Sequence, residues 1–425
     1  MSSEHKISPV SQPRFFYGWH MVIASWIMVF LINAVAVGVF FKSMLEDFGW
    51  DRATLSSVQF VGLAIFTVAS PFLGQFIDRF GPRLMILVCV APQVLSSAIN
   101  GLATNIGHLY LARFFYGINV LYGTQILINR WFIKKRGMAL GILATAYPIG
   151  SMVLAPVSQQ LILLWGWRPT MFFWAGVTLV IMLPLALIIR NRPEDMGWEP
   201  DGNLLDSYRS VTPSSQPRFI ASEAKLGTKT GFGFFEAIKT APFWLLSLAH
   251  FACGTGCGFM MTHIVIFATD MGYSDMIAAS LLSVQGGSNL VGVLATGYLS
   301  DRMSRSMVLA LTHFVRTLSF VTIVVFILLG GGSLWMLYTA MVFFGFGWYT
   351  TAPLTAGLVA DLFGGSRMGA ILGVATSCHM LGMAIGAYAG GVIFELTEGY
   401  FLFFIVQCAL SLMATLFSLA IKRVS

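Results

Sequence analysis

The chain has 425 residues, of which 57% are hydrophobic and only 10% are charged, and its mean hydropathy is +0.79. This balance is far more apolar than that of soluble globular domains, so it excludes an ordinary soluble enzyme or binding domain. The formal net charge of +7 is concentrated in loops that follow apolar runs. It therefore indicates a membrane topology, and no nucleic-acid partner is expected.

Twelve apolar runs, each about long enough to cross a bilayer core, follow one another along the chain. They are residues 17–40, 54–76, 84–103, 108–129, 137–163, 170–190, 242–268, 277–299, 306–329, 333–358, 367–393 and 399–421. Backbone inside lipid has to satisfy its own hydrogen bonds, so these runs are predicted to be α-helices. The fold class is therefore an all-α membrane protein with twelve transmembrane helices.

Basic residues indicate the orientation of these helices. Of the 25 Lys and Arg residues, 20 lie in the two terminal segments and in alternate loops. The opposite loops contain only Lys42, Arg52 and Arg168, and Arg113 and Arg316 lie inside runs. The positive-inside rule predicts cytoplasmic termini, and the short loops favour a bacterial inner membrane.

A turn between the second and third runs reads Gly-x-x-x-Asp-Arg-x-Gly-x-Arg, and a degraded copy follows the eighth run. The two copies begin 223 positions apart, at Gly74 and Gly297, which indicates two similar halves. A carboxylate at a helix N-terminus contributes about 0.3–1 kcal/mol, so we expect the turns to latch the cytoplasmic helix ends together. The plainer interpretation is that short inside turns simply need glycine and arginine. The predicted latch residues are Gly74, Asp78, Arg79, Gly81, Arg83, Arg136, Gly297, Asp301 and Arg302.

Residues 191–240 are rich in Pro, Ser, Gly and charge, which is typical of a linker. We therefore predict an N-terminal six-helix bundle (1–190), a cytoplasmic linker (191–240) and a C-terminal six-helix bundle (241–425). All five cysteines lie within apolar runs. Cys253 and Cys257 are one helical turn apart, with no His or acidic residue between or directly beside them, so packing is expected there, with no metal and no cofactor.

Polar residues within the runs are the candidate substrate contacts. Every one of the 18 acidic residues lies in a loop, a terminus or a run end, so a site near the midplane is expected to be neutral and to contain histidine. The candidates for substrate binding are Tyr122, Gln125, Tyr147, His250, Gln285, Asn289, Tyr349 and His379. Each of these side chains is equally suited to hydrogen bonding between helices.

Four residues are candidates for anion binding or proton coupling. His250 suits proton binding because histidine titrates near neutral pH; the alternative is a neutral histidine bonded to a carbonyl. Arg316 is a full charge within a run, with His313 on the same helix face, and its planar fork suits a carboxylate. Arg113 either braces the fourth helix or binds an anion.

The turn motif resembles the signature of the major facilitator superfamily, and Arg113 with Gly117 resembles the Arg-x-x-x-Gly motif of that superfamily's fourth helix. Trp131-Phe-x-Lys-Lys-Arg-x-x-Ala-x-Gly141 looks like the fifth-helix signature of monocarboxylate transporters. The short loops are similar to those of the bacterial oxalate–formate exchanger branch. The chain departs from both patterns: Asn289 stands where monocarboxylate transporters have an acidic residue, and His379 stands where the exchanger branch has a lysine.

This resemblance implies a secondary active transporter of a small organic anion that works by alternating access. Protons or a counter-anion would then be the coupling partner, the lipid bilayer the surroundings, and no obligate protein partner is predicted. Efflux of a hydrophobic or aromatic compound is an alternative within transport, and a membrane sensor is an alternative from another class. No zinc-protease motif, nucleophile elbow or phosphate loop occurs, so no enzyme activity is expected.

Overall fold

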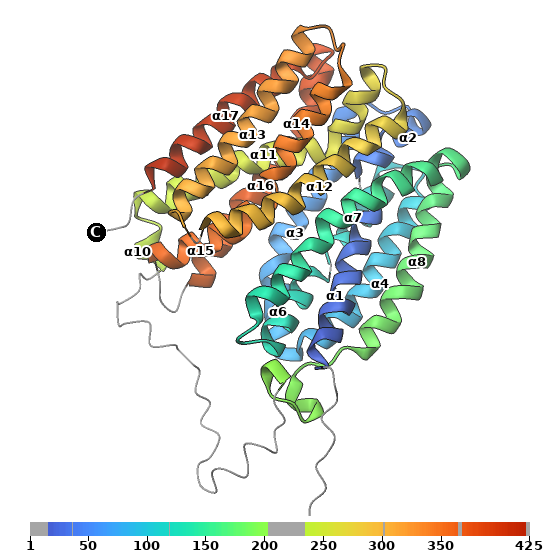
Figure 1. Ribbon diagram of the computed structural model, residues 1–425. Helices are drawn as coiled ribbons and strands as arrows, with labels where there is room; N and C mark the ends of the chain where they lie inside the picture. The colour runs from blue at the N-terminus through green and yellow to red at the C-terminus, as the bar shows by residue number, and fades with distance from the viewer. Residues whose placement is uncertain are drawn as a thin grey trace, which may run out of the picture.

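The computed structural model describes residues 16–35, 37–118, 120–202, 234–300, 302–363 and 368–421. Long helices dominate these ranges and confirm the predicted all-α membrane architecture (Figure 1). The first half contains α1 (Gly18–Ile32), the 3-10 helix η1 (Asn33–Val35), α2 (Val37–Phe48), α3 (Arg52–Phe80), α4 (Pro82–Gly101), α5 (Ile106–Tyr116), α6 (Leu121–Trp131), α7 (Arg136–Trp165) and α8 (Trp167–Ile188). The short 3-10 helices η2 (Pro193–Met196) and η3 (Pro200–Gly202) follow. The second half contains α10 (Phe234–Ala237), α11 (Ala241–Asp270), α12 (Asp275–Ser300), α13 (Arg305–Leu328), α14 (Leu334–Phe346), α15 (Thr351–Phe363), α16 (Met368–Thr397) and α17 (Phe401–Ala420).

Three of the predicted runs are not single α-helices: the 3-10 helix η1 separates α1 from α2 in the first run, and two others are broken. Ten segments of the described chain are long and apolar enough to cross a membrane. The remaining runs, 108–129 and 333–358, are each divided near the midpoint. α5 ends at the cap residue Gly117 before α6 begins, and α14 ends at the cap residue Gly347 before α15 begins. The twelve runs therefore correspond to helices, but the first, the fourth and the tenth are not continuous α-helices.

Side chains from neighbouring helices satisfy the backbone at both breaks. Gln93 of α4 donates from Nε2 to the carbonyl oxygens of Tyr116 and Ile118, both at 3.3 Å. Arg316 of α13 donates from Nη2 to the carbonyl oxygen of Gly347 at 2.6 Å. Arg316 follows Gln93 by 223 positions, the same spacing as Gly74 to Gly297. In each half, a side chain from a neighbouring helix thus satisfies backbone carbonyls that would otherwise be unpaired inside lipid.

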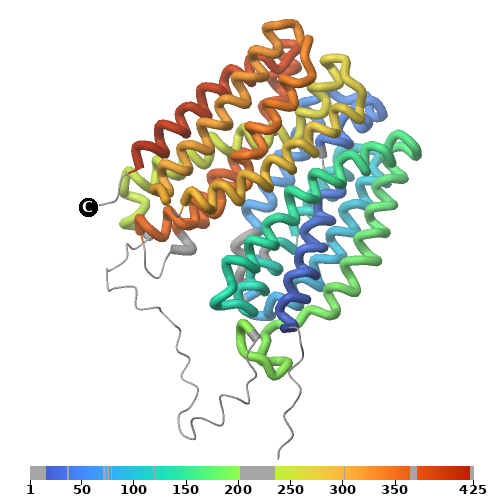
Figure 2. The backbone as a smooth tube through the Cα atoms, viewed as in Figure 1, coloured from blue at the N-terminus to red at the C-terminus, as the bar shows by residue number. Residues whose placement is uncertain are grey.

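The helices form two groups that lie side by side in Figures 1 and 2, with α1 to α8 in blue to green and α11 to α17 in yellow to red. Within the first group α4 packs on α8 and α1 on α7; within the second α11 packs on α16 and α13 on α17. The most extensive contacts between the groups are those of α3 with α16, α7 with α12, and α2 with α11. These pairs surround the space in which the candidate site lies.

Glycines bring α11 and α16 into backbone contact. A Cβ atom on Gly258 of α11 would lie 1.9 Å from the carbonyl oxygen of Met383. A Cβ atom on Gly386 of α16 would lie 1.9 Å from the carbonyl oxygen of Thr255. Small residues at helix interfaces are the usual means of tight packing inside a membrane, where lipid offers no hydrophobic drive for helix association. The α11–α16 pair is therefore a close-packed wall of the second group.

The outer surface of the helices is apolar, as a lipid-facing surface requires. On α8, Val180 is 71% exposed, and neighbouring exposed side chains are Leu179, Ile181 and Leu183. On α17, Leu416 is 56% exposed. In water such an apolar surface would cause aggregation, whereas in lipid it is stable. The protein is therefore an integral, multi-pass membrane protein.

Asp201 of η3 holds the loop that precedes α7. Its carboxylate accepts hydrogen bonds from the backbone N–H groups of Ile133, Lys134 and Lys135, at 3.0, 2.7 and 3.1 Å. Partial burial acts to raise the pKa of Asp201, but the three backbone hydrogen bonds outweigh it and leave the pKa lowered. The backbone of Asp201 has a positive φ of 67°, a conformation that Asp and Asn adopt more readily than most residues. The start of the segment after α8 is thus fixed to the first helical group.

Candidate functional site

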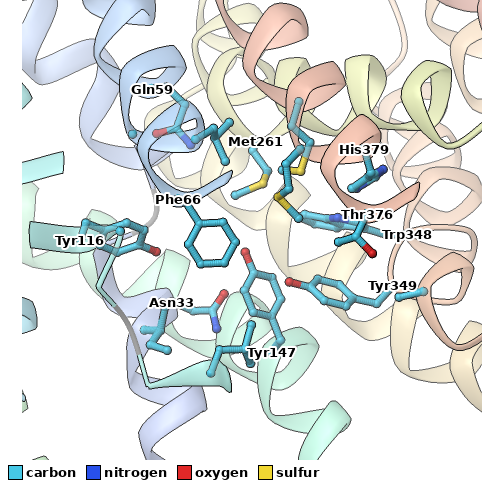
Figure 3. A pocket seen from close by; sticks show the side chains of 18 of the residues that line it. Asn33, Gln59, Phe66, Tyr116, Tyr147, Met261, Trp348, Tyr349, Thr376 and His379 are labelled. Carbon is cyan, nitrogen blue, oxygen red and sulfur yellow. The ribbon is translucent and has the colours of Figure 1, made fainter. Parts of the chain in front are cut away.

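A cavity of about 460 Å³ lies between the two groups of helices (Figure 3). Its walls come from α1, η1, α3, α5, α6 and α7 on one side, and from α11, α12, α15 and α16 on the other. Both helix breaks face it, because Gly117 of the first break and Trp348 and Tyr349 of the second line the wall. The breaks therefore place polar backbone and large aromatic side chains beside the same space.

Aromatic and neutral polar side chains make up most of the visible wall. In Figure 3, Phe66 points to the centre of the cavity, with Tyr116 on one side and Trp348 on the other. The amides of Asn33 and Gln59 extend toward the same space from η1 and α3. No acidic residue lines the cavity in the part of the chain that is described. The surroundings suit a ligand with an apolar or aromatic body.

Arg113 is the only cavity-lining residue, among those described, that carries a full formal charge. It is 7% exposed, its Nε has no hydrogen-bond partner, and no hydrogen bond or ion pair joins its guanidinium to another described residue. Its Cζ lies 5.3 Å from the ring centroid of Tyr116. On α3, Gly62 leaves room for it: a Cβ there would lie 3.0 Å from Cδ of Arg113. A buried cation without a counter-charge therefore borders the cavity.

Five of the predicted substrate residues line this cavity, namely Gln125, Tyr147, His250, Tyr349 and His379. Tyr147 of α7 and Tyr349 of the second break come from opposite groups, and their ring centroids are 4.5 Å apart. In Figure 3 the hydroxyl group of Tyr349 points toward Tyr147. This tyrosine pair therefore joins the two groups at the cavity wall.

The two cavity histidines are neighbours. The rings of His250 and His379 have centroids 5.0 Å apart, and Nδ1 of His379 lies 3.1 Å from the carbonyl oxygen of His250. A carbonyl oxygen can only accept, so Nδ1 of His379 carries the proton in this contact. Nδ1 of His250 lies 3.4 Å from the hydroxyl of Thr355. These contacts arrange two titratable groups on the wall formed by α11 and α16.

Two predicted substrate residues lie elsewhere. Asn289 of α12 donates from Nδ2 to the carbonyl oxygen of Gly345 at 2.9 Å, at the contact between α12 and α14. Gln285, one turn earlier, is fully buried beside the same glycine, and neither amide atom has a partner among the described residues. Neither side chain lines the cavity. The side chain of Tyr122 lies outside the described residues.

Arg316 and His313 lie inside the second group of helices and not at the cavity. Besides Gly347, the guanidinium of Arg316 donates to the carbonyl oxygen of Cys253 at 3.1 Å and contacts the sulfur of that residue. Nδ1 of His313 lies 3.1 Å from the hydroxyl of Ser418 on α17. In the described structure Arg316 braces a helix break, and His313 joins α13 to α17.

The predicted latch residues occupy the helix ends near the chain termini. The side chains of Gly74 and Asp78, and all of Asp301, lie outside the described residues. Arg79 stacks over Phe80 and Arg302 over Tyr298, each with a neighbour from the same segment. The backbone N–H of Arg83 donates to Asn191, and Gly81 has a φ of +84°. Arg136 caps α6 through the carbonyls of Asn129 and Phe132, and the carbonyl oxygen of Gly297 accepts a hydrogen bond from the hydroxyl of Ser300 at 2.8 Å. The latch stays a prediction for a conformation in which these ends meet.

At the opposite helix ends, a polar cluster that we call the Arg52 closure joins the two groups. The guanidinium of Arg52 binds both carboxylate oxygens of Asp270, at 2.6 and 2.8 Å, and the hydroxyl of Tyr400 at 2.9 Å. Its Cζ lies 3.6 Å from the ring centroid of Phe394. Its backbone N–H donates to Glu395 at 2.8 Å. Arg52 therefore fixes the start of α3 to α11, α16 and the start of α17.

Two further contacts extend the Arg52 closure. Nζ of Lys42 lies 2.7 Å from the carboxylate of Asp275, again between the two groups. The hydroxyl of Ser56 lies 3.3 Å from Nε2 of His263, which is fully buried behind Arg52. Sequence reasoning did not identify this closure. The signal in the sequence was that Lys42 and Arg52 lie in loops on the side of the membrane where few Lys and Arg residues occur. It also missed Asn33, Gln59 and Thr376 of the cavity wall, which no motif marks.

Comparisons with known proteins agree with this architecture. A family model for the Major Facilitator Superfamily matches residues 21–387. An uncharacterised transporter of that type from Bacillus subtilis is 27% identical over 406 residues, which cover 90% of each chain. Monocarboxylate transporter 13 of Rattus norvegicus is 25% identical over 95% of this chain and 88% of its own. Monocarboxylate transporter 4 of Gallus gallus is 24% identical over 94% of this chain and 81% of its own. Because the family model spans most of the sequence and the fold is the expected helical one, the chain belongs to the major facilitator superfamily of membrane transporters.

Proposed function

We propose that this transporter carries an organic monocarboxylate with an apolar or aromatic body, and that Arg113 binds its carboxylate. The observation that supports the proposal is a buried arginine, without a counter-ion among the described residues, on the wall of the central cavity. Burying an unpaired charge is costly, and an anion that enters the cavity would offset this cost. The planar guanidinium fork matches a carboxylate with two parallel hydrogen bonds.

The rest of the wall supports an apolar body for the cargo. A volume of about 460 Å³ lies within the range of about 300–1,000 Å³ typical of pockets for drug-sized molecules. Phe66, Tyr116, Trp348 and the tyrosine pair present flat apolar surfaces to this volume. The monocarboxylate transporters among the relatives carry this substrate class in their names. An aromatic or branched acid would fill the cavity better than the smallest acids.

Alternating access would operate by rocking two bundles, residues 1–190 and 241–425, against each other about the linker 191–240. The described conformation is closed at the ends that carry the Arg52 closure. With the termini in the cytoplasm, as the basic loops favour, those ends face away from the cytoplasm. The predicted latch at Asp78 and Asp301 would then form when the opposite ends close. The predicted bacterial inner membrane fits the short loops, and the Bacillus subtilis relative is likewise bacterial.

Coupling would use the His250–His379 pair, since no carboxylate lines the described cavity. Binding of a proton to this pair would accompany binding of the anion at Arg113 and would give symport. Exchange of one anion for another is the second candidate, favoured by the lack of an acidic proton carrier beside Arg113. Within either scheme, Gln125 and the tyrosine pair serve as neutral contacts to the cargo.

Counterflow in proteoliposomes tests the cargo and the role of Arg113 together. The panel compares acetate, benzoate and phenylacetate with benzamide, which keeps the shape of benzoate without its charge. We expect benzoate and phenylacetate to be transported and benzamide to be ignored. Arg113→Gln should raise the KM for the acids by roughly 30- to 150-fold, because truncating one partner of a buried charge pair costs about 2–3 kcal/mol. Arg113→Lys should lose less, since it keeps the charge.

Arg168→Gln is the matched control, because Arg168 pairs with Asp47 inside the first group and neither residue lines the cavity. An imposed proton gradient that drives uptake into empty vesicles indicates symport, whereas uptake that needs internal acid indicates exchange. Equal transport of benzamide and benzoate, unchanged in Arg113→Gln, would instead support a carrier of neutral aromatic compounds, which the aromatic wall also suits. A protein that exchanges nothing would leave only the sensor interpretation.

A further inference from the structure

Three potential metal ligands meet between α11 and α16. The sulfur atoms of Cys253 and Cys257, one turn apart on α11, and a ring nitrogen of His379 on α16 all lie within 4.8 Å of one another. Both cysteines are buried and unbridged, and His379 is half-buried on the cavity wall. In sequence the histidine is more than a hundred positions from the cysteines, so only the fold brings this set together.

The tautomer of His379 leaves its second nitrogen available. Nδ1 donates to the carbonyl oxygen of His250 at 3.1 Å, so in the neutral ring Nε2 carries a lone pair. No hydrogen bond to Nε2 of His379 occurs among the described residues. Histidines that bind metals usually donate their other N–H to a carbonyl or carboxylate in this manner, which fixes the ring and raises its basicity. His379 is therefore held as a ligand would be.

The two thiols have a cationic neighbour. The guanidinium of Arg316 contacts the sulfur of Cys253 and donates to the carbonyl oxygen of the same residue at 3.1 Å. No carboxylate pairs with Arg316 among the described residues. The hydroxyl of Thr351 lies 4.0 Å from the same sulfur. A cation beside a thiol favours its thiolate form, which is the form that binds metal.

We propose that Cys253, Cys257 and His379 form a binding site for a soft divalent cation of the zinc and cadmium class. Two sulfurs and one nitrogen are the ligand types that such ions prefer, and three protein ligands leave a fourth, open position for water or an anion from the cavity. Tetrahedral bonds of about 2.3 Å to sulfur require sulfur atoms about 3.8 Å apart. The ligand atoms lie within 4.8 Å of one another, so side-chain adjustments that move them by at most about 1 Å reach this spacing.

Charge balance favours occupancy of this buried place. A divalent cation replaces the two thiol protons, which leave to water, so the cluster with Arg316 keeps the same net charge before and after binding. Binding therefore adds no buried net charge. The cavity provides the entry path, because His379 lines its wall. An ion here would link α11 to α16 and occupy a ring nitrogen of the cavity-lining residue His379. The expectation that this slows transport rests on the proposed function, whereas binding itself does not.

Cadmium titration of the purified, chelator-treated full-length protein tests the site. Thiolate coordination gives an ultraviolet charge-transfer absorption, and equilibrium dialysis counts the bound ions. We expect one ion per chain with this absorption, displaced by zinc. Cys253→Ser, Cys257→Ser and His379→Gln should each weaken binding at least tenfold. Cys89→Ser and Cys408→Ser serve as matched controls, because these cysteines lie on α4 and α17 outside the cluster.

His379→Gln keeps the test decisive if a cysteine variant fails to fold, because the histidine is half-buried and its loss removes only the nitrogen ligand. The proposal is overturned if no thiolate absorption develops, or if the control cysteines weaken binding as much as the cluster residues. Cadmium binding that is unchanged in His379→Gln would equally refute this ligand set. Neither result affects the proposed cargo, because Arg113 is not part of the cluster.

Discussion

Removing the guanidinium of Arg52 should shift the transporter toward the conformation in which the Arg52 closure is open. The side chain of Arg52 is 13% exposed and that of Asp270 is 28% exposed, so water screens this pair only partly. Arg52 makes two hydrogen bonds to Asp270, one to Tyr400 and a close stacking contact with Phe394. All of these contacts cross between the two helical groups, and all are lost when the groups separate at this end.

The expected magnitude follows from these contacts. Exposed ion pairs contribute about 0.2–1 kcal/mol, and truncating a buried, hydrogen-bonded pair costs about 3–5 kcal/mol. Arg52 lies between these limits, and the stacking on Phe394 adds about 0.5–1 kcal/mol. We therefore expect Arg52→Gln to shift the equilibrium between closed and open states by about 2–3 kcal/mol. This corresponds to roughly a 30- to 150-fold change in the equilibrium constant.

Distance measurements between spin labels can follow the shift. Leu102 and Leu329 are 65% and 68% exposed, and they lie at the same end of the molecule on different groups. Labels at these positions, in a background with the five native cysteines replaced, report separation of that end by electron–electron double resonance in nanodiscs. The Arg52→Gln protein should show a longer distance with a larger population than the parent.

Arg168→Gln is the control for this experiment. Its ion pair with Asp47 joins α8 to α2 within one group, so it does not change when the groups separate. The side chains of this pair are 36% and 40% exposed. Asp270→Asn should act in the same direction as Arg52→Gln, and the double variant should shift the equilibrium by less than the sum of the two. The reasoning is refuted if Arg52→Gln leaves the distances unchanged, or if Arg168→Gln alters them equally.

Three further predictions concern stability. Gly258→Ala should lower the melting temperature of the purified protein sharply, because its Cβ would overlap the carbonyl oxygen of Met383 on the facing helix. Gly373→Ala should not lower it, because a Cβ at that position would have no neighbour within 4 Å, and equal effects of the two changes would contradict the packing argument. Arg316→Gln should reduce the yield and the melting temperature, because Arg316 braces a helix break, while the folded protein keeps nearly normal substrate affinity in a binding assay. A loss of affinity without a loss of stability would show instead that Arg316 binds the cargo. The lowered pKa of Asp201 means that its hold on the loop before α7 is complete above the ordinary carboxyl range and is lost as pH falls through the depressed pKa. Hydrogen exchange at Ile133, corrected for intrinsic rate, should therefore accelerate only at acidic pH, and Asp201→Asn should accelerate it at neutral pH; pH-independent protection would contradict this.

The positions of the helices were largely decided by the sequence, because hydropathy depends on composition over about twenty residues and lipid permits few alternatives to a helix. The Gly74–Arg83 turn likewise indicated the superfamily, which the family match over residues 21–387 confirms. The two helix breaks were not predicted. A few unpaired peptides after Gly117 or Gly347 hardly change mean hydropathy, and their stability depends on Gln93 and Arg316 from other helices.

Only the tertiary structure distinguished among the polar residues inside the membrane. Arg113 and Arg316 look equivalent in sequence. In the structure Arg316 donates hydrogen bonds to backbone carbonyls, whereas Arg113 lines the cavity and its guanidinium has no hydrogen-bond partner among the described residues. Arg52 and Asp270 are 218 positions apart, and Cys257 and His379 are also distant in the chain. The energy of a buried charge or a metal ligand depends on which groups surround it, and the packing of separate helices determines those groups.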